Sequence, residues 1–296
     1  MSAGGATESG VVVVIERRVL LDPDLEGILV DRGYVVVPLL ADDEVAALRD
    51  WYLRASVDRT HLPDDAYDPT YAEFTVIHAD PRFRAESFEH IVDVVGGRVT
   101  SMLDRYRPLV ANYVNKPVGS GVVPLHQNWS VVDEQRFRSV SVWIALVDCD
   151  SVNGALEVLD GSHRRLRDPR GMWAYEAFAG VADDVREVLE LVPVPAGHAV
   201  ILDDALLHYS APNRGSEDRL AIQLIMLPGE APSRFCERVD QVGDIMEVDV
   251  WEVEPRFFWD FWHGAGDQRY GRRVERIQLS LPQFDRDRFL RTFLPQ

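Results

Sequence analysis

Alternation of apolar and polar residues begins at about residue 110 and predicts short β-strands from there on. Between Ser139 and Leu146, valine, isoleucine and leucine occupy every second position, and smaller or more polar residues lie between them. Over Arg219–Leu227, aliphatic residues and a methionine share one face, while Arg219, Ala221 and Gln223 share the other. Both stretches therefore predict sheet strands with one apolar face and one more polar face.

A repeat of three to four residues before position 110 predicts helices instead. Asp42 is a typical N-cap, and the helix expected over Asp43–Ala55 carries an apolar stripe. A second helix is expected over Phe88–Leu103. Its stripe consists of Ile91, Val95, Val99 and Leu103. The segment 168–191 interrupts the strands and is expected to be helical or loop-like.

Many short strands separated by turns are typical of a sandwich or barrel, here with the helices packed outside it. Further strands are expected at 33–38, 156–159, 192–194, 199–202 and 206–208. Residues 1–10 are small and polar, which predicts disorder, and Val11–Ile15 is a strand candidate. With no repeat and no linker, residues 11–296 are interpreted as a single domain with N-terminal helices and an aromatic-rich C-terminal segment.

Charge and composition narrow the choice of partners. The 31 basic and 49 acidic residues give a net charge of −18, which disfavours nucleic acid and anionic membranes. Cys149 and Cys236 form no CxxC pair, so neither a disulfide framework nor a zinc ribbon is expected. No signal peptide or membrane-spanning run is recognised, and the expectation is a cytoplasmic protein with a small-molecule substrate.

Two histidine motifs carry the candidate chemistry. In His126-Gln127-Asn128, positions 126 and 128 point to the same side of a strand and can address one metal ion. The second motif is His208-Tyr209-Ser210, and Arg219 follows His208 after eleven residues and a tight turn. A hairpin there would bring Arg219 beside His208, where it could hold a carboxylate with two hydrogen bonds, and Ser210 could add a donor.

Two histidines and one carboxylate, with open positions for other ligands, form the metal site of non-haem Fe(II) oxygenases. In such a site a 2-oxo acid takes two open positions of the metal, and O₂ takes the last. The two motifs together therefore indicate an oxygenase, although either histidine alone would more often be a structural core residue.

From about residue 28 to residue 230 the chain resembles the phytanoyl-CoA dioxygenase-like oxygenases. The opening of this region reads GYVVVPLLADDEVAALRDWY, the middle holds Trp143 and the run from Asn153 to His163, and the end holds His208, Ser210 and Arg219. The resemblance implies a mainly β fold with flanking helices, namely a double-stranded β-helix or cupin-like jelly roll. It also implies Fe(II), 2-oxoglutarate as co-substrate, and O₂.

The same resemblance assigns roles to individual residues. His126 and His208 bind the metal, and Arg219 and Ser210 hold 2-oxoglutarate. Trp143 and Gln127 line the cofactor pocket, with Tyr113 and Lys116 as weaker cofactor-binding candidates. His163 is expected to support a loop at the pocket mouth.

Asn128 departs from the family pattern, which has a metal-binding aspartate at this position. Three interpretations stay open. The amide could bind the metal weakly, it could be displaced so that water, substrate or halide enters as in a halogenase, or the chain could be a non-catalytic relative. Asp133 and Glu134 are nearby carboxylates, but neither has the i, i+2 spacing from His126.

The predicted function is oxidation of a small-molecule C–H bond, with hydroxylation of a natural-product intermediate as the default. The alternatives are a non-catalytic jelly-roll binding protein, a cupin-like isomerase or hydrolase, a halogenase-like enzyme, and an acyl-CoA hydroxylase. The aromatic segments Met172–Phe178 and Phe257–His263 could form a pocket lid, a homodimer face or simply core. Thr75–His78 is a further candidate for the pocket wall.

Overall fold

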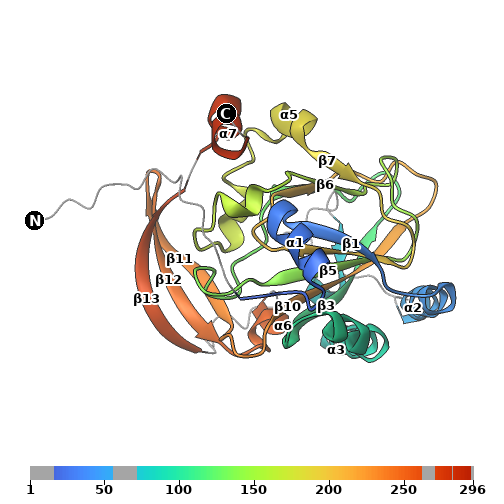
Figure 1. Cartoon of the computed structure of the whole chain (residues 1–296). Coiled ribbons are helices and arrows are strands. Elements are labelled where there is room, and N and C mark those ends of the chain that lie inside the picture. The colour runs from blue at the N-terminus through green and yellow to red at the C-terminus, as the bar shows by residue number, and fades with distance from the viewer. Residues whose placement is uncertain (1–16, 56–71, 262–270, 282, 295–296) are drawn as a thin grey trace, which may run out of the picture.

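The structure is a computed structural model that describes residues 17–55, 72–261, 271–281 and 283–294. The segment predicted to be disordered, residues 1–10, and the strand candidate Val11–Ile15 lie outside this part of the chain. Two antiparallel sheets face each other, and a third sheet lies on one side of the pair (Figure 1).

The larger sheet has six strands in the order β1-β8-β5-β10-β3-β2. These strands are β1 (Tyr34–Pro38), β8 (His198–Asp203), β5 (Val140–Ala145), β10 (Arg219–Pro228), β3 (Tyr106–Lys116) and β2 (Glu73–Phe74). The smaller sheet has four strands in the order β4-β9-β6-β7. They are β4 (Val123–His126), β9 (His208–Ser210), β6 (Leu156–Val158) and β7 (Glu190–Val192).

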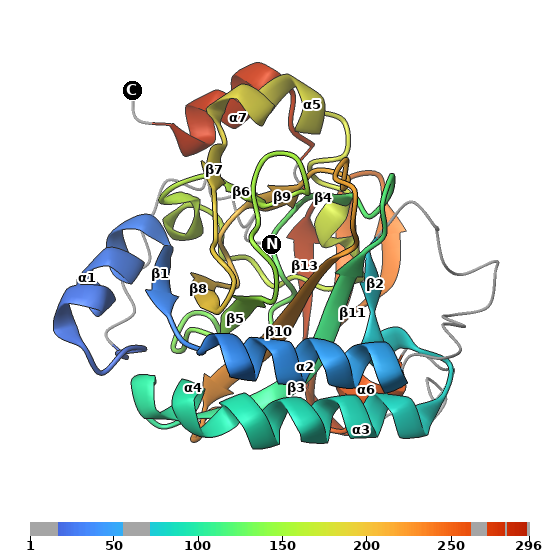
Figure 2. The ribbon, with the colours of Figure 1, turned by 90° about the vertical axis from the view of Figure 1, so that its right-hand side faces the viewer.

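Helices cover the outer face of the larger sheet. They are α1 (Pro23–Arg32), α2 (Asp42–Ala55), α3 (Pro81–Ile91) and α4 (Gly97–Met102), and the last two are joined by a π-helical turn at Val92–Gly96. Figure 2 shows α2, α3 and α4 running across this face. The aliphatic positions of β5 and β10 pack beneath them in one hydrophobic core.

This arrangement confirms the face assignment made from the alternation. Every second residue from Val140 to Leu146 and from Leu220 to Met226 lies in the core under the helices. The residues between them, including Trp143 and Ala221, face the space between the two sheets. The polar side of the pattern therefore points into the jelly roll, where a site can form.

The predicted helical stripe is also confirmed, because Ile91, Val95, Val99 and Leu103 are all buried. The helix begins at Pro81, before the predicted Phe88, since Asp80 caps it and a proline fits its first turn. Residues spaced four apart do not stay on one face of an α-helix, because a turn has only 3.6 residues. The π-helical turn has more residues per turn, so it helps to keep the four side chains on the buried face.

The third sheet was not predicted as such. It has the order β11-β12-β13, with β11 (Arg234–Val242), β12 (Ile245–Val253) and β13 (Gly271–Ser280). Its inner face packs against the 166–181 segment and against α7 (Arg286–Phe293), and two short helices, α5 (Ala182–Val185) and α6 (Phe257–Asp260), flank it. Most of β13 is exposed and rich in charge, so its sequence lacks the alternation that marks a half-buried strand.

The fold class is the predicted one, mainly antiparallel β with flanking helices in a jelly-roll arrangement. Both cysteines are buried and free. Among the helices of the described segments, none combines the length and apolar character needed to cross a bilayer.

Candidate functional site

His126 and His208 meet across two neighbouring strands of the smaller sheet. Strands β4 and β9 place them opposite each other, and their ring centroids lie 4.1 Å apart. The Nδ1 atom of His126 lies 2.8 Å from the Pro124 carbonyl oxygen, and that of His208 lies 2.9 Å from the Leu206 carbonyl oxygen. When Nδ1 donates to a carbonyl, Nε2 keeps its lone pair for a metal ion.

Burial keeps both imidazoles neutral. It lowers the pKa of His208 to about 4. Burial and the neighbouring His208 hold the pKa of His126 well below its ordinary value. Because a metal ligand must be a deprotonated imidazole, the pair is ready for a cation at neutral pH.

Asn128 completes this end of the site. Asn128 lies beside His126, and because its Nδ2 atom is turned to other partners, the amide oxygen is the end left to face the ring. Its Nδ2 atom donates to the Ser141 hydroxyl at 3.1 Å and to the Asp204 carboxylate at 2.9 Å. His126 and Asn128 are thus brought together, although β4 ends at His126 and Asn128 lies just after the strand.

Asp204 is the residue of this group that sequence reasoning missed. It is fully buried, and that burial raises the pKa of its carboxyl to about 6. The signal for it was the pair Asp203-Asp204, two carboxylates directly after a buried strand and four residues before His208. Asp203 pairs with Arg167, so Asp204 is the one of the two that turns toward Asn128.

Arg219 forms the second end of the site. Its side chain is 1 % exposed, and its guanidinium carbon lies 5.1 Å from the centre of the Trp143 ring. The Cys149 thiol lies beside it, and burial raises the pKa of that thiol to about 11, so the thiol is no counter-anion. The Nε atom and one terminal nitrogen of Arg219 have no hydrogen-bond partner within the described chain.

Lys116 adds a second buried nitrogen beside Arg219, its register partner across β3 and β10. Its Nζ atom donates to the Ser210 hydroxyl at 2.6 Å and to the Ala211 carbonyl at 2.6 Å. The Ser210 hydroxyl in turn donates to the Gly154 carbonyl at 2.7 Å. Burial, and then the charge of Arg219, lower the pKa of Lys116 to about 6.

These two ends fit the metal and the 2-oxo acid that the sequence predicts. Two neutral imidazoles and an amide oxygen suit Fe(II), and an unpaired buried guanidinium suits a carboxylate. Within the described residues, no three His, Cys, Asp or Glu side chains gather to hold a metal ion. Asn128 is the polar side chain that lies next to His126 here, so its amide oxygen is the candidate for a third protein ligand.

Two predicted cofactor residues lie away from this group. The amide nitrogen of Gln127 donates to the carbonyls of Leu166 at 2.8 Å and Ala205 at 2.6 Å. The hydroxyl of Tyr113 donates to the Leu48 carbonyl at 3.3 Å, within the core under the helices. Both assignments to the cofactor pocket are therefore corrected, because Gln127 bonds the backbone of two other segments and Tyr113 packs in the core under the helices.

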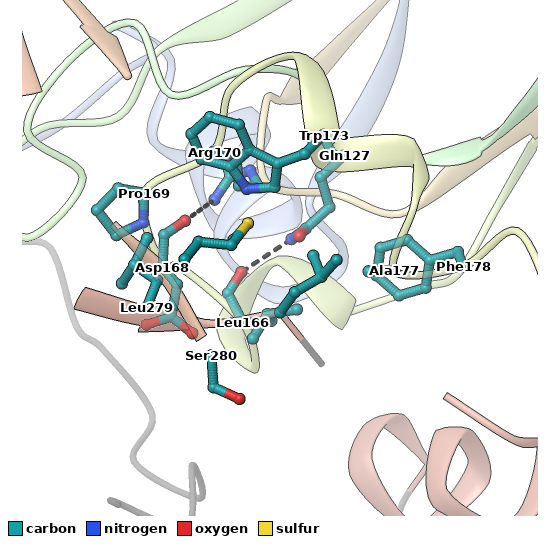
Figure 3. Close-up of a pocket in the computed structure, with 13 residues that line it drawn as sticks. Gln127, Leu166, Asp168, Pro169, Arg170, Trp173, Ala177, Phe178, Leu279 and Ser280 are labelled. Atoms are coloured by element: carbon teal, nitrogen blue, oxygen red, sulfur yellow. Dashed lines mark hydrogen bonds between the residues drawn. The ribbon is translucent and has the colours of Figure 1, made fainter. Parts of the chain in front are cut away.

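Gln127 instead lines a separate cavity between the 166–178 segment and the third sheet (Figure 3). The cavity is small, with a volume of about 40 Å³, and its wall is mostly apolar. Trp173, Phe178 and Met246 contribute to that wall. The cavity lies behind the segment that carries His126 and Asn128.

Of the aromatic candidates, Tyr175 reaches the histidines. Its ring stacks on His126 with centroids 4.5 Å apart and an interplanar angle of 20°. It belongs to the 3₁₀ helix Met172–Tyr175 and is partly exposed, so it covers the site on the solvent side. Phe257 and Phe258 are buried in a core cluster, and His263 lies outside the described residues.

Other candidates serve the scaffold. Thr75 accepts a hydrogen bond from the Tyr113 backbone, and the His163 ring bonds to the Val30 carbonyl in α1. Glu134 forms ion pairs with Arg170 and Arg167, and Asp133 forms one with Arg234. Neither carboxylate takes the place of the missing aspartate.

Comparisons with known proteins agree with this description. The sequence profile described as phytanoyl-CoA dioxygenase (PhyH) matches residues 29–221. Phytanoyl-CoA dioxygenase domain-containing protein 1 from Bos taurus is 31 % identical over 158 residues, 49 % of this chain and 53 % of the relative. The Danio rerio protein of that name is 30 % identical over 132 residues, 41 % of this chain and 45 % of the relative. The matched part thus spans about half the length of these relatives.

Solved structures show the same fold. HygX from Streptomyces hygroscopicus, solved with nickel, 2-oxoglutarate and hygromycin B, is 20 % identical with a TM-score of 0.50, covering 71 % of this chain and 88 % of HygX. EctD from S. alaskensis with bound Fe is 20 % identical with a TM-score of 0.50, and the match covers 73 % of this chain and 79 % of EctD. Iron is named for EctD and 2-oxoglutarate for HygX, in agreement with the cofactors that the sequence predicts.

Proposed function

Because this chain belongs to the phytanoyl-CoA dioxygenase family, we propose that it is an Fe(II)- and 2-oxoglutarate-dependent oxygenase that oxidises a C–H bond of a small molecule. Bound iron and 2-oxoglutarate supply the oxidising chemistry: 2-oxoglutarate, O₂ and the substrate R–H give succinate, CO₂ and R–OH. The protein contributes positioning, charge and exclusion of water.

The observation that carries this proposal is the uncompensated charge of Arg219. A guanidinium keeps its charge even in a buried site, and burying it without an anion is costly. The described residues offer it the Trp143 ring and a neutral thiol, but no carboxylate. A ligand with a carboxylate restores the missing partner, and 2-oxoglutarate has such a group at the end far from its 2-oxo acid.

Each residue of the site then has a defined task. His126, His208 and the Asn128 oxygen would hold the metal, and Arg219 would hold the distal carboxylate. Ser210 would add a donor after its hydroxyl turns from the Gly154 carbonyl, and Trp143 keeps the guanidinium in place by stacking.

The substrate enters next to Tyr175, which stacks on His126 at the solvent side. We propose a small natural-product intermediate. The net charge of −18 supports an uncharged or cationic compound over a coenzyme A thioester, whose phosphates favour basic pockets.

Succinate formation tests the proposal. The full chain is incubated with Fe(II), 2-oxoglutarate and O₂ against a panel of small molecules and acyl-CoA esters, and products are identified by mass spectrometry. We expect succinate in step with substrate oxidation and its loss in Arg219→Ala. Turnover of acyl-CoA esters alone would overturn the substrate class.

Asn128 supports one rival, a binding protein without catalysis, because an amide gives iron no negative charge. That protein would bind metal and 2-oxoglutarate yet form no succinate with any substrate. The assay above therefore separates the two.

A further inference from the structure

We propose that Asp204 supplies the negative charge of the metal site through Asn128, so that the amide is the ligand and the carboxylate behind it is the anion. The proposal rests on the metal site of the proposed function and deepens it. It makes Asp204 a positioning residue that acts through Asn128.

The first support is the orientation of the amide. Both hydrogens of Asn128 Nδ2 are used, one on the Asp204 carboxylate at 2.9 Å and one on the Ser141 hydroxyl at 3.1 Å. The amide oxygen is thereby directed toward His126. The reverse orientation would place that oxygen against a carboxylate and lose both hydrogen bonds, so Asp204 fixes which end of the amide faces the metal.

The second support is that the two segments are held together at more than one point. The Asn128 backbone nitrogen donates to the Asp204 carbonyl at 2.9 Å, and the Ser141 hydroxyl donates to the same carboxylate oxygen at 2.7 Å. Ser141 lies on β5 and Asp204 directly follows β8, two adjacent strands of the larger sheet. The carboxylate is therefore a built part of the jelly-roll wall.

The third support is charge balance. Asp204 is 1 % exposed, and the ion pairs of the described residues give it no cation, whereas its neighbour Asp203 has Arg167. The second carboxylate oxygen, Oδ2, has no hydrogen-bond partner within the described residues. A buried carboxylate of this kind is costly unless a positive charge lies close, and a divalent metal at the two histidines would provide one.

The simpler arrangement, in which Asp204 itself binds the metal, is not the one that the hydrogen bonds favour, because the Asp204 carboxylate is bonded to Asn128 and Ser141. Within the part of the chain that the structure describes, Asp204 does not gather with His126 and His208 into a three-residue metal group. The carboxylate lies behind the amide, as a partner that orients a metal ligand and tunes its charge. In this interpretation the negative charge that the usual aspartate would place on the metal is carried by Asp204. It lies farther from the metal, with the Asn128 side chain between them.

Co(II) titration followed by visible absorption tests the proposal without turnover, with His208→Ala as the baseline for adventitious binding. Asp204→Asn keeps an acceptor oxygen but removes the charge, and we expect Co(II) affinity to fall by about tenfold or more. Asp168→Asn removes the same charge on the Gln127 side, and this control should stay within about threefold of the parent.

The exchange variant Asn128→Asp/Asp204→Asn keeps one amide and one carboxylate in contact. We expect its Co(II) affinity to lie within about threefold of the parent, because the charge of the pair is unchanged. Binding about tenfold tighter than the parent would show that Asp204 contributes nothing, and so would an Asp204→Asn variant that equals the parent. If Asp204→Asn fails to fold, the exchange variant alone decides.

The outcomes also separate this inference from the proposed function. A parent that binds Co(II) no better than His208→Ala overturns both. A parent that binds Co(II), with no effect of Asp204→Asn, overturns only the role of Asp204. Binding that follows the expected series but yields no succinate overturns only the oxygenase function.

Discussion

Two clusters of buried charge lie within the jelly roll, and they differ in how the charges are balanced. In the first, Glu134 lies 2.6 Å from Arg170 and 3.7 Å from Arg167, and Arg167 also pairs with Asp203. In the second, Arg219 and Lys116 lie side by side with no carboxylate from the described residues among their hydrogen-bond partners.

The contrast separates scaffold from site. The balanced cluster links the loop that carries Arg167 and Arg170 to Asp203 at the end of β8 and to Glu134, and it needs nothing from outside the protein. The unbalanced cluster is complete only when an anion arrives. A buried charge therefore points to a ligand when its partner is missing, and to structure when its partner is present.

The largest expected effect comes from breaking the balanced cluster. Glu134→Gln keeps the shape but leaves Arg170 as a buried cation without an anion, and we expect the free energy of unfolding to fall by about 3–5 kcal/mol. Urea denaturation measures this. Glu176→Gln, which removes one end of the exposed pair with Arg238, is the control and should cost less than about 1 kcal/mol. Equal losses in the two variants would contradict the comparison.

The unbalanced cluster should respond in the opposite way. Arg219→Met removes a buried charge that has no partner, so we expect the stability of the ligand-free protein to stay level or rise. Binding of 2-oxoglutarate to the Ni(II)-loaded protein should weaken by about 2–5 kcal/mol, measured by calorimetry. A destabilised ligand-free protein with unchanged binding would show that Arg219 serves the scaffold.

The sequence predicts well wherever one face of an element is buried and the other is not. The alternation in β5 and β10 determines which side chains enter the jelly roll, and it assigns Arg219 to the inner face. Asn128 also lies next to His126 as predicted, although β4 ends at His126. The alternation is a local geometric consequence of a strand, so a single sequence can carry it.

Prediction is weaker where both faces are buried or both are exposed. Strand β3 is almost wholly buried around Tyr113, so apolar character does not tell which side that residue faces. Strand β13 is almost wholly exposed and charged, which hides it. The role of Asp204 depends on a contact between segments 76 residues apart, and no local pattern encodes that contact.

Gln127 sharpens the comparison, because it lies between the two metal-site residues yet serves the scaffold. Gln127→Leu leaves the carbonyls of Leu166 and Ala205 without their donor, so we expect a loss of about 1–3 kcal/mol in the free energy of unfolding. The affinity for 2-oxoglutarate should stay within about twofold, since the side chain lines a separate cavity to which Arg219 does not contribute. If Gln127→Leu weakens 2-oxoglutarate binding without lowering stability, Gln127 belongs to the cofactor pocket after all.

The smallest and most specific effect is a pH dependence of 2-oxoglutarate affinity, which only the unbalanced cluster can produce. Burial and the charge of Arg219 lower the pKa of Lys116 to about 6 in the free protein. A bound carboxylate favours the charged lysine and raises that pKa. Below pH 6 the proton is present with or without ligand, so affinity is flat. Above it, Lys116 must take up a proton, and affinity should fall by up to about tenfold per pH unit.

Calorimetry of 2-oxoglutarate binding to the Ni(II)-saturated protein checks this. The metal is added first, so that any proton uptake or release at Asp204 and the two histidines is complete before 2-oxoglutarate is added. In buffers of different ionisation enthalpy at pH 8, we expect uptake of about one proton by the parent and none by Lys116→Met. A parent that takes up no proton would mean that the carboxylate is bound by Arg219 alone. In that case Lys116 belongs with the balanced scaffold, held by the Ser210 hydroxyl and the Ala211 carbonyl.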